Sequence, residues 1–323
     1  MKKRILHLEP EKYSVKDLNF LKNKFELDCR ENLSQSELEE ITKTNKYDVI
    51  FTKLGLQLNK IIIENQNSLS YIVTPTTGLN HIDTSFCDSK NIKIISLKDE
   101  KDFLNEVRST AEHTWAILLS LIRNINYAAF DVKNGNWQRE PFLASELDGK
   151  TIGIVGFGRL GKMVVNFSMA FNMNVLANDI DESVFESNNP HNLTNSPLSD
   201  ILKKSDIISL HIPSNKINNQ FINENKIKLM KKGVIIINTS RGEIIDEKAL
   251  VKYLINKKVS ALATDVLTND SIWEKKVDPN NLIYKYSLSN SNVLITPHMG
   301  GYGKSSIIKT RNFITNKFIN SFK

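Results

Sequence analysis

Residues 151–161 read Thr-Ile-Gly-Ile-Val-Gly-Phe-Gly-Arg-Leu-Gly, an apolar run that leads into three glycines spaced Gly-x-Gly-x-x-Gly. The run predicts a buried strand, and the glycines predict a tight turn that opens a helix. Gly156 permits the turn, Gly158 lets the backbone approach a pyrophosphate, and Gly161 lets the helix pack closely on the strand. Because the first N–H groups of such a helix bind phosphate, this stretch predicts a nucleotide-binding turn.

An acidic residue follows this turn at the end of the next expected strand, residues 173–179, which closes with Asp179. A carboxylate at this place accepts both ribose hydroxyls and repels a 2′-phosphate, which favours NAD over NADP. Asp179 alone could equally be a turn or helix-capping residue, and flavin and S-adenosylmethionine sites also use glycine turns. A flavin site of this kind usually begins at the amino terminus, and this turn does not.

Beyond residue 149, apolar strands alternate regularly with helical segments. The expected strands are 151–155, 173–179, 206–213, 233–240, 260–267 and 292–298, and the expected helices are 161–171, 199–205, 223–230 and 246–258. Such alternation, with almost continuously apolar strands, is typical of a parallel sheet covered on both faces. We therefore predict an α/β fold with a Rossmann-type doubly wound sheet in this part of the chain.

The first hundred residues have shorter α/β units. Strands are expected at 4–10, 47–52 and 69–75, with a helix at 34–45. A long helical pattern from about residue 105 to 126 reads as a connection between domains, and 304–323 reads as one amphipathic helix. That last helix is too short to be a domain, so we expect it to pack against the first part.

Composition excludes several classes of protein. The 323 residues are 40% hydrophobic and 24% charged, which is ordinary for a globular protein. No apolar run approaches the roughly 20 residues of a membrane span, and the amino terminus lacks a convincing signal peptide. Cys29 and Cys87 are too few for a disulfide framework, which favours a reducing cytoplasm. The net charge of +7 comes from lysines spread along the chain, so we predict neither nucleic-acid nor membrane binding.

Ionisable side chains follow three of the later expected strands. Arg241 follows 233–240, Asp265 and Asp270 lie around the end of 260–267, and His298 ends 292–298. Because ligands of an open α/β sheet lie beyond the carboxyl ends of its strands, these groups are expected to face one crevice. Arg is a bidentate partner for a carboxylate, His transfers protons near neutral pH, and a carboxylate orients the imidazole. Together they suit hydride transfer to a 2-keto acid.

Each of these residues also has an ordinary structural explanation. Arg241 could lie at the surface, His298 could be a satisfied turn histidine, and Asp270 could be a solvated loop residue. Their joint placement at the ligand edge favours the catalytic interpretation. The remaining histidines have no comparable setting, and no pair has the spacing of metal ligands, so no metal is expected. They are His7, His81, His113, His191 and His211.

Over essentially its whole length the chain resembles the D-isomer-specific 2-hydroxyacid dehydrogenase family. The matching blocks are 74–83, 109–124, 149–162, 209–223, 233–250, 261–266 and 295–301. The resemblance implies that a Rossmann-type NAD-binding domain, residues 105–298, is inserted into a smaller flavodoxin-like substrate domain formed by 1–104 and 299–323. Residues 75–83, PTTGLNHID, are similar to those of 3-phosphoglycerate dehydrogenase-like members.

The resemblance also implies individual roles. Arg241 would bind the substrate carboxylate and carbonyl, His298 would be the general acid/base, and Asp270 would stand where the family has a Glu paired with that histidine. Other positions would bind the substrate carboxylate (Thr76, Thr77, Gly78), contact the pyrophosphate (Arg159, Leu160), the ribose (Asp179) and the nicotinamide side (Thr239, Asp265), and line the cofactor cleft (Ile212, Pro213). Further cofactor-binding positions would be Gly156, Gly158, Gly161 and Ser240.

One departure from the family pattern affects the catalytic loop. Asp270 is one methylene shorter than the usual Glu, and Glu274 is a candidate substitute that lies outside the family pattern. We therefore expect an NAD-dependent oxidoreductase that interconverts a small D-2-hydroxy acid and its 2-keto acid, 3-phosphoglycerate included, and that forms a homodimer. The alternative is a non-catalytic NAD(H)-sensing protein on the same fold, which the altered loop suggests and the retained Arg241 and His298 oppose.

Overall fold

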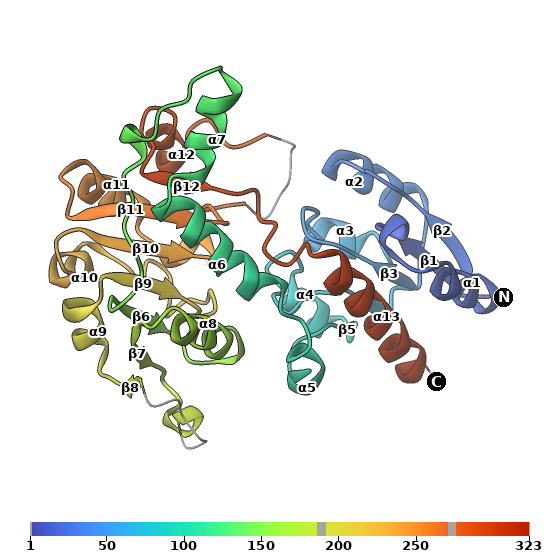
Figure 1. The fold of residues 1–323 in the computed structure, drawn as a ribbon. Coiled ribbons are helices and arrows are strands. Elements are labelled where there is room, and N and C mark those ends of the chain that lie inside the picture. Colours follow the sequence, from blue (N-terminus) through green and yellow to red (C-terminus); the bar gives the residue numbers. More distant parts are fainter. Residues whose placement is uncertain (1, 186–191, 271–275, 323) are drawn as a thin grey trace. The chain divides into compact units, whose positions relative to one another are not determined.

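A computed structural model describes residues 2–185, 192–270 and 276–322. The chain divides into two compact units (Figure 1). Unit 1 comprises Met1–Val107, Asp270–Lys276 and Gly303–Lys323, and unit 2 comprises Arg108–Asn269 and Val277–Tyr302. The predicted α/β class is confirmed, while the assignment of one unit to substrate and the other to cofactor stays a prediction.

Unit 2 contains a seven-stranded, wholly parallel sheet in the order β12-β11-β10-β9-β6-β7-β8. Strand order reverses between β6 and β9, as it does in Rossmann-type sheets. The strands are β6 Thr151–Val155, β7 Asn174–Asn178, β8 Leu193–Asn195, β9 Ile207–Leu210, β10 Val234–Asn238, β11 Val259–Thr264 and β12 Val293–Ile295.

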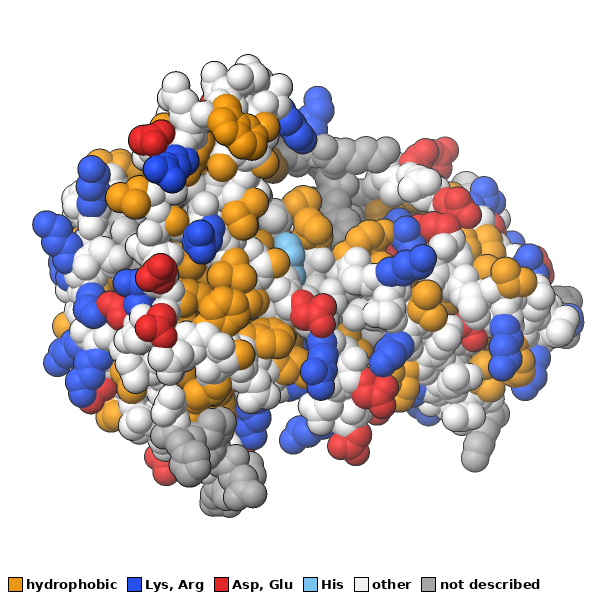
Figure 2. Space-filling view, viewed as in Figure 1, with side chains coloured by type: hydrophobic (Ala, Val, Ile, Leu, Met, Phe, Trp, Pro, Cys, Tyr) orange, Lys and Arg blue, Asp and Glu red, His pale blue; other side chains and the backbone are white. Residues whose placement is uncertain are grey.

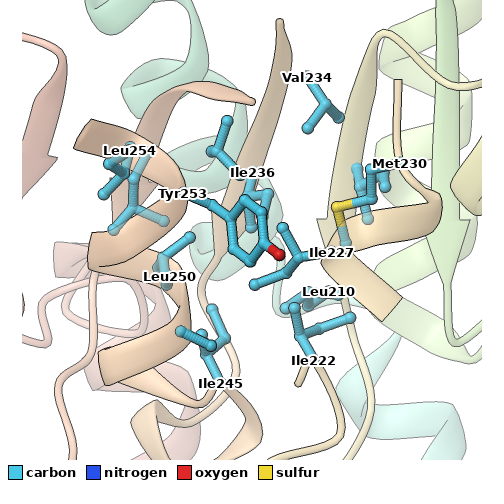
Figure 3. Packing of buried hydrophobic residues seen from close by; sticks show 14 of the residues in the cluster. Leu210, Ile222, Ile227, Met230, Val234, Ile236, Ile245, Leu250, Tyr253 and Leu254 are labelled. Carbon is cyan, nitrogen blue, oxygen red and sulfur yellow. The ribbon is translucent and has the colours of Figure 1, made fainter. Parts of the chain in front are cut away.

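Helices cover both faces of this sheet and enclose two apolar cores. On one face α6 and α8 bury Trp115 and Val164 against the sheet. On the other, Tyr253 and Ile227 pack among the strand residues of the second core (Figure 3). The helices are α6 Ser109–Ile122, α7 Ile125–Lys133, α8 Arg159–Ala170, α9 Leu198–Lys204, α10 Glu224–Leu229, α11 Glu247–Ile255 and α12 Leu282–Ser287, with short 3-10 turns η2 Glu140–Phe142, η3 Glu182–Phe185 and η4 Gly242–Ile244.

Unit 1 contains a five-stranded parallel sheet in the order β2-β1-β3-β4-β5, the order of flavodoxin-like folds. Helix α13 packs on it with α1, so that Phe318 and Ile314 join the same core as Leu21. The elements are β1 Arg4–His7, η1 Pro10–Lys12, α1 Val15–Lys24, β2 Glu26–Cys29, α2 Gln35–Thr44, β3 Val49–Phe51, α3 Lys60–Glu64, β4 Tyr71–Val73, α4 Thr84–Ser89, β5 Lys93–Ile95, α5 Lys101–Leu104 and α13 Lys304–Ser321.

The expected connecting helix differs from the structure. Instead of one helix from about 105 to 126, the chain forms α5, then α6 from Ser109, and then α7 from Ile125. Asn124 adopts a left-handed conformation with φ 55° between α6 and α7, so the helical hydrogen-bond pattern is interrupted there. No helix in the described part of the chain is both long and apolar enough to span a lipid bilayer.

Candidate active site

The glycine turn joins β6 to α8 at the carboxyl edge of the unit 2 sheet. Gly156 has φ +95°, and a Cβ there would lie 2.7 Å from the His211 carbonyl oxygen. At Gly161 a Cβ would strike the Gly156 carbonyl, whereas at Gly158 it would meet no atom of the described residues within 4 Å. Gly158 is also the N-cap of α8, and as a glycine it has no side chain to cap that helix end. The turn is therefore tight on the protein side and open where a pyrophosphate would approach the helix N-terminus.

Asp179 faces this turn from the end of β7. Its Oδ2 accepts a hydrogen bond from the Phe157 N–H at 2.7 Å, and its Oδ1 accepts one from the Asp181 N–H at 3.0 Å. The Phe157 ring also stacks on Phe185 of η3, with centroids 4.7 Å apart. The structure therefore brings the predicted acidic partner to the glycine turn, and the residues present fit a dinucleotide.

The ends of β9 and β10 continue the same edge of the sheet. Ile212 follows β9 and lies beside the glycine turn, because a Cβ on Gly156 would be 3.0 Å from Ile212 Cγ2. After β10, the Ser240 hydroxyl donates to the Leu210 carbonyl at 2.8 Å, and Thr239 Oγ1 lies 2.7 Å from Thr114 Oγ1 of α6. The first bond joins the end of β10 to the end of β9, and the second joins the end of β10 to α6.

Arg241 leaves the same edge directly after these residues. Its Nη1 donates to the Ser240 carbonyl at 2.6 Å, and its own carbonyl accepts from Asn238 Nδ2 at 2.8 Å. Within residues 2–185, 192–270 and 276–322, no carboxylate forms an ion pair with the Arg241 guanidinium. Gly242 lets this segment approach the loop after β11 closely, because a Cβ on Gly242 would strike the Leu267 backbone. The guanidinium is therefore available to an anionic ligand.

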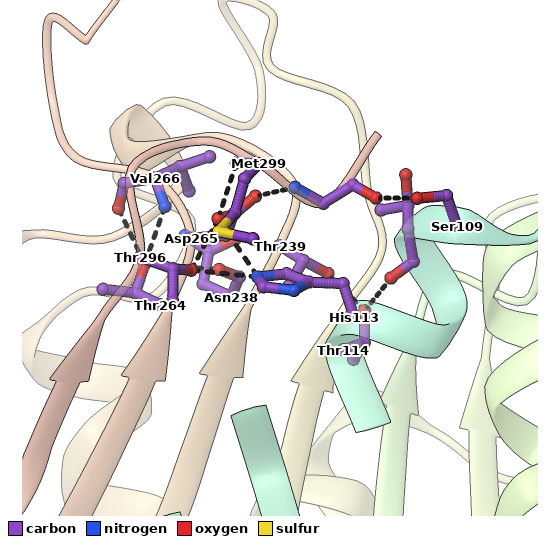
Figure 4. A network of polar contacts seen from close by, with 12 residues as sticks. Ser109, His113, Thr114, Asn238, Thr239, Thr264, Asp265, Val266, Thr296 and Met299 are labelled. Carbon is purple, nitrogen blue, oxygen red and sulfur yellow. Dashed lines mark hydrogen bonds and ion pairs between the residues drawn. The ribbon is translucent and has the colours of Figure 1, made fainter. Parts of the chain in front are cut away.

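Asp265 lies at the end of β11 and is only 2% exposed. Its Oδ2 accepts from the Gly300 N–H at 2.7 Å, and its Oδ1 accepts from the Met299 N–H at 2.9 Å and from the Thr296 hydroxyl at 2.5 Å (Figure 4). Burial by itself would raise the pKa of this carboxyl, but these hydrogen bonds and one from His113 outweigh it and lower the pKa below its ordinary value. Asp265 is therefore a buried anion that organises the turn after β12.

His298 lies on that turn. Its backbone N–H donates to the Asp265 carbonyl at 2.9 Å, and its φ of 52° places it in the left-handed region. The side chain is partly exposed at the carboxyl edge of the sheet, in the same unit as Arg241 and the glycine turn. Unit 2 thus gathers the predicted cofactor residues and two of the predicted catalytic residues along one edge.

Thr76, Thr77 and Gly78 belong to unit 1, in the loop after β4. The Thr76 hydroxyl lies 2.9 Å from Thr74 Oγ1 and donates to the Gly78 carbonyl at 2.8 Å, so the loop is internally fixed. Asp270 is also grouped with unit 1. The roles of these residues towards substrate and His298 stay predictions, and Glu274 lies outside the described residues.

Sequence reasoning missed His113, which it grouped with histidines of no particular setting. On α6 its Nε2 lies 2.9 Å from Thr296 Oγ1 and 3.2 Å from Asp265 Oδ1. Reasoning from the motif also assigned Asp265 to the nicotinamide side and did not anticipate that both its oxygens bind the turn of His298. The only available signal was the helical spacing of residues 109–124, which does not reveal which strand ends the helix faces.

Comparison with known proteins finds relatives of this chain by sequence. A family model described as "D-isomer specific 2-hydroxyacid dehydrogenase, NAD binding domain" matches residues 115–300. The hydroxypyruvate reductase of Thermotoga maritima is 34% identical over 87% of this chain and 86% of its own length. The D-3-phosphoglycerate dehydrogenase of Methanocaldococcus jannaschii is 33% identical over 85% of this chain, but this chain spans only 49% of that protein.

A solved structure is similar over nearly the whole chain. The D-lactate dehydrogenase of Aquifex aeolicus, complexed with NAD and lactic acid, superposes with a TM-score of 0.80 at 30% identity and covers 98% of this chain and 95% of its own. The likeness therefore extends to both units and not only to the segment that matches the family model.

Proposed function

This chain belongs to the D-isomer specific 2-hydroxyacid dehydrogenase family, and on that basis we propose that it interconverts a small 2-keto acid and the corresponding D-2-hydroxy acid with NAD(H). One observation carries the proposal: unit 2 gathers the open glycine turn, Arg241 and His298 at the carboxyl edge of one sheet. Bound NAD(H) supplies or accepts the hydride.

The side chains of this chain perform the remaining steps. In the reductive direction, the Arg241 guanidinium binds the keto-acid carboxylate and polarises the adjacent carbonyl. The protonated His298 imidazole gives a proton to the carbonyl oxygen as that oxygen gains negative charge. Asp270 pairs with His298 and stabilises the protonated ring, and the Thr76–Gly78 loop receives the substrate carboxylate through its backbone.

Preference for NAD over NADP follows from Asp179. Its carboxylate lies at the end of β7 and accepts the Phe157 N–H of the glycine turn, which is where the adenosine ribose binds in such sites. A 2′-phosphate placed there would meet a negative charge at short range, and such repulsion disfavours NADP.

Turnover of a panel of keto acids tests the activity. The panel comprises hydroxypyruvate, glyoxylate, pyruvate and the phosphorylated keto acid derived from 3-phosphoglycerate, each assayed with NADH by loss of absorbance at the nicotinamide band. We expect turnover of at least one acid, and His298→Ala should lower kcat about 1,000-fold or more while the Kd of NADH stays within about twofold. Tight NADH binding without turnover of any acid would instead support the non-catalytic NAD(H)-sensing alternative.

We also propose a homodimer that joins through an apolar surface around α7 of unit 2. None of the residues of α7 is buried, even though several are apolar: Phe130 is 65% exposed, and Trp137 beyond the helix is 88% exposed. Exposed apolar side chains are visible where α7 lies, whereas the Lys and Arg side chains of this face are interspersed with Asp and Glu (Figure 2). The α7 apolar surface comprises Ile125, Tyr127, Phe130, Val132, Trp137 and Leu143.

Several exposed apolar side chains within one short segment are typical of an interface between subunits. Sedimentation should therefore give the mass of a dimer for the unmodified chain and of a monomer for Phe130→Asp. Ile255→Asp, at a 66% exposed site on α11, is the matched control and should leave the dimer intact. An unmodified chain that sediments as a monomer contradicts the dimer.

We place the enzyme in the cytoplasm, with small-molecule partners and neither nucleic-acid nor membrane binding.

A further inference from the structure

A second histidine contacts the turn that carries His298. His113 is on α6, and its side chain is 13% exposed. Its Nε2 lies 2.9 Å from Thr296 Oγ1 and 3.2 Å from Asp265 Oδ1 (Figure 4). The ring therefore contacts residues from the ends of both β11 and β12.

The direction of these hydrogen bonds follows from the number of available protons. The Thr296 hydroxyl donates its one proton to Asp265 Oδ1 at 2.5 Å, so its oxygen can only accept from His113. The His113 Nε2 must then carry a proton, whether the ring is neutral or charged. The result is a directed chain in which His113 donates to Thr296 and Thr296 donates to Asp265.

This series of hydrogen bonds ends at Asp265, whose carboxylate fixes the backbone around His298. Asp265 accepts the N–H groups of Met299 and Gly300, the two residues that follow His298. The left-handed conformation of His298 is strained for a residue with a side chain and persists only where its surroundings determine it. The hydrogen-bonded carboxylate provides that constraint.

Helix α6 also packs directly on the turn. The Ser109 hydroxyl donates to the Gly300 carbonyl at 2.7 Å. A Cβ on Gly300 would lie 2.9 Å from Asp265 Oδ2 and 3.4 Å from His113 Cδ2, so the backbone fits against both groups with no space to spare. A displacement of the His113 ring is therefore transmitted to the turn.

We infer that His113 is a positioning residue for the reaction, which acts through Thr296 and Asp265 to hold the turn from Thr296 to Gly300 and hence the imidazole of His298. The inference rests on the proposed function, because the position of His298 matters only if His298 transfers a proton. His113 itself touches neither substrate nor the reacting atoms in this assignment.

Two substitutions at His113 distinguish the effect of its hydrogen bond from the effect of its side-chain volume. His113→Gln keeps an N–H donor at the distance of Nε2, whereas His113→Leu fills similar space without a donor. Since misplacement of a reacting group by about 1 Å can cost about 100-fold, His113→Leu should lower kcat about 10- to 100-fold. It should also shift the pH at which kcat is half-maximal, with the Kd of NADH within about twofold of the unmodified chain.

His113→Gln should restore most of kcat and the original pH profile. Ser120→Ala on the same helix is the matched control, because the Ser120 hydroxyl bonds to the exposed Asn126 side chain and not to the turn, and kcat should be unchanged. Hydrogen exchange of a peptide spanning 296–302 gives a readout apart from activity: in His113→Leu the Met299 and Gly300 amides should exchange faster.

Two results overturn the inference while the proposed function stands. One is a His113→Leu enzyme with unchanged kcat and pH profile. The other is a parallel loss of kcat, NADH affinity and thermal stability that His113→Gln does not restore, because that pattern marks a purely structural residue. An unmodified chain that turns over no keto acid overturns the proposed function, and with it the role of His113 in the reaction, even if the exchange experiment confirms the hydrogen bonds.

Discussion

Each unit buries a carboxylate near the carboxyl end of its sheet, but the two carboxylates have different partners. In unit 1, Glu9 is 7% exposed and pairs with Arg311 of α13, whose Nη2 lies 2.6 Å from Glu9 Oε2. In unit 2, Asp265 has no arginine or lysine partner among the described residues, and backbone amides, a hydroxyl and an imidazole surround it.

The two carboxylates therefore have different structural roles: Glu9 anchors distant segments to each other, and Asp265 fixes the geometry of one turn. The Glu9 and Arg311 pair joins two segments at opposite ends of the sequence, and removing one member would leave an uncompensated buried charge. The donors to Asp265 come instead from one short turn and the helix beside it, so the carboxylate determines local backbone geometry. Loss of the Glu9–Arg311 pair should therefore lower the free energy of unfolding, whereas loss of the hydrogen bonds to Asp265 should lower kcat.

The largest effect is expected from breaking the anchor of unit 1. Arg311→Leu leaves Glu9 buried and unpaired, so the free energy of unfolding should fall by about 3 kcal/mol or more, measured by denaturant titration. NADH affinity under native conditions should not change, since the pair lies in the other unit.

Lys309→Ala is the matched control for this variant. Lys309 is on the same helix, but its pair with Glu106 is exposed, with side chains 47% and 67% accessible. Its loss should cost less than about 1 kcal/mol. Equal effects of Arg311→Leu and Lys309→Ala would show that the buried pair is not the anchor described here.

A smaller effect is expected from acid, through His7 of unit 1 and His211 of unit 2. Burial, assisted by the Arg311 charge, lowers the pKa of His7 to about 3, and burial lowers the pKa of His211 to about 4. Both values lie below the unfolded value of about 6.5, so each contribution to stability is complete above that pH and is lost as pH falls towards the folded pKa. From pH 6.5 to 5, the free energy of unfolding should fall by about 2 kcal/mol for each histidine.

His7→Phe isolates the contribution of unit 1. The His7 ring stacks on Phe51 with centroids 4.9 Å apart, so a phenyl ring fits the same packing. Calorimetry between pH 8 and pH 5 should show a shallower decline for this variant than for the unmodified chain. Superimposable pH dependences would mean that His7 does not resist protonation in the folded state.

Every central strand could be predicted from the sequence, whereas of the four edge strands in the described residues only β12 could. The predicted segment 151–155 coincides with β6, and 47–52, 206–213 and 233–240 contain β3, β9 and β10. The three unpredicted strands, β2, β5 and β8, all lie at sheet edges. An edge strand has one neighbour and carries more polar side chains, as Glu-Leu-Asp-Cys in β2 illustrates, so its apolar pattern is weak.

The site shows the same division between local and distant information. The glycine turn is encoded within a few adjacent residues, and the alternation of elements places Asp179, Arg241 and His298 at strand ends. The contact of His113 with Thr296 joins residues 183 positions apart. That contact depends on how α6 crosses the sheet, which local propensity does not specify.

Helix α13 has a consequence for the order in which the chain matures on the ribosome. Phe318 is fully buried in the unit 1 core, between Phe51 and Phe25, so that core lacks a central side chain until residue 318 has been synthesised. All of unit 2 precedes that helix in the sequence and can complete its own sheet first. The strands of unit 1 therefore emerge before unit 2 although their core is completed after it, and until then the apolar face of β1 and β3 lacks the cover of α13.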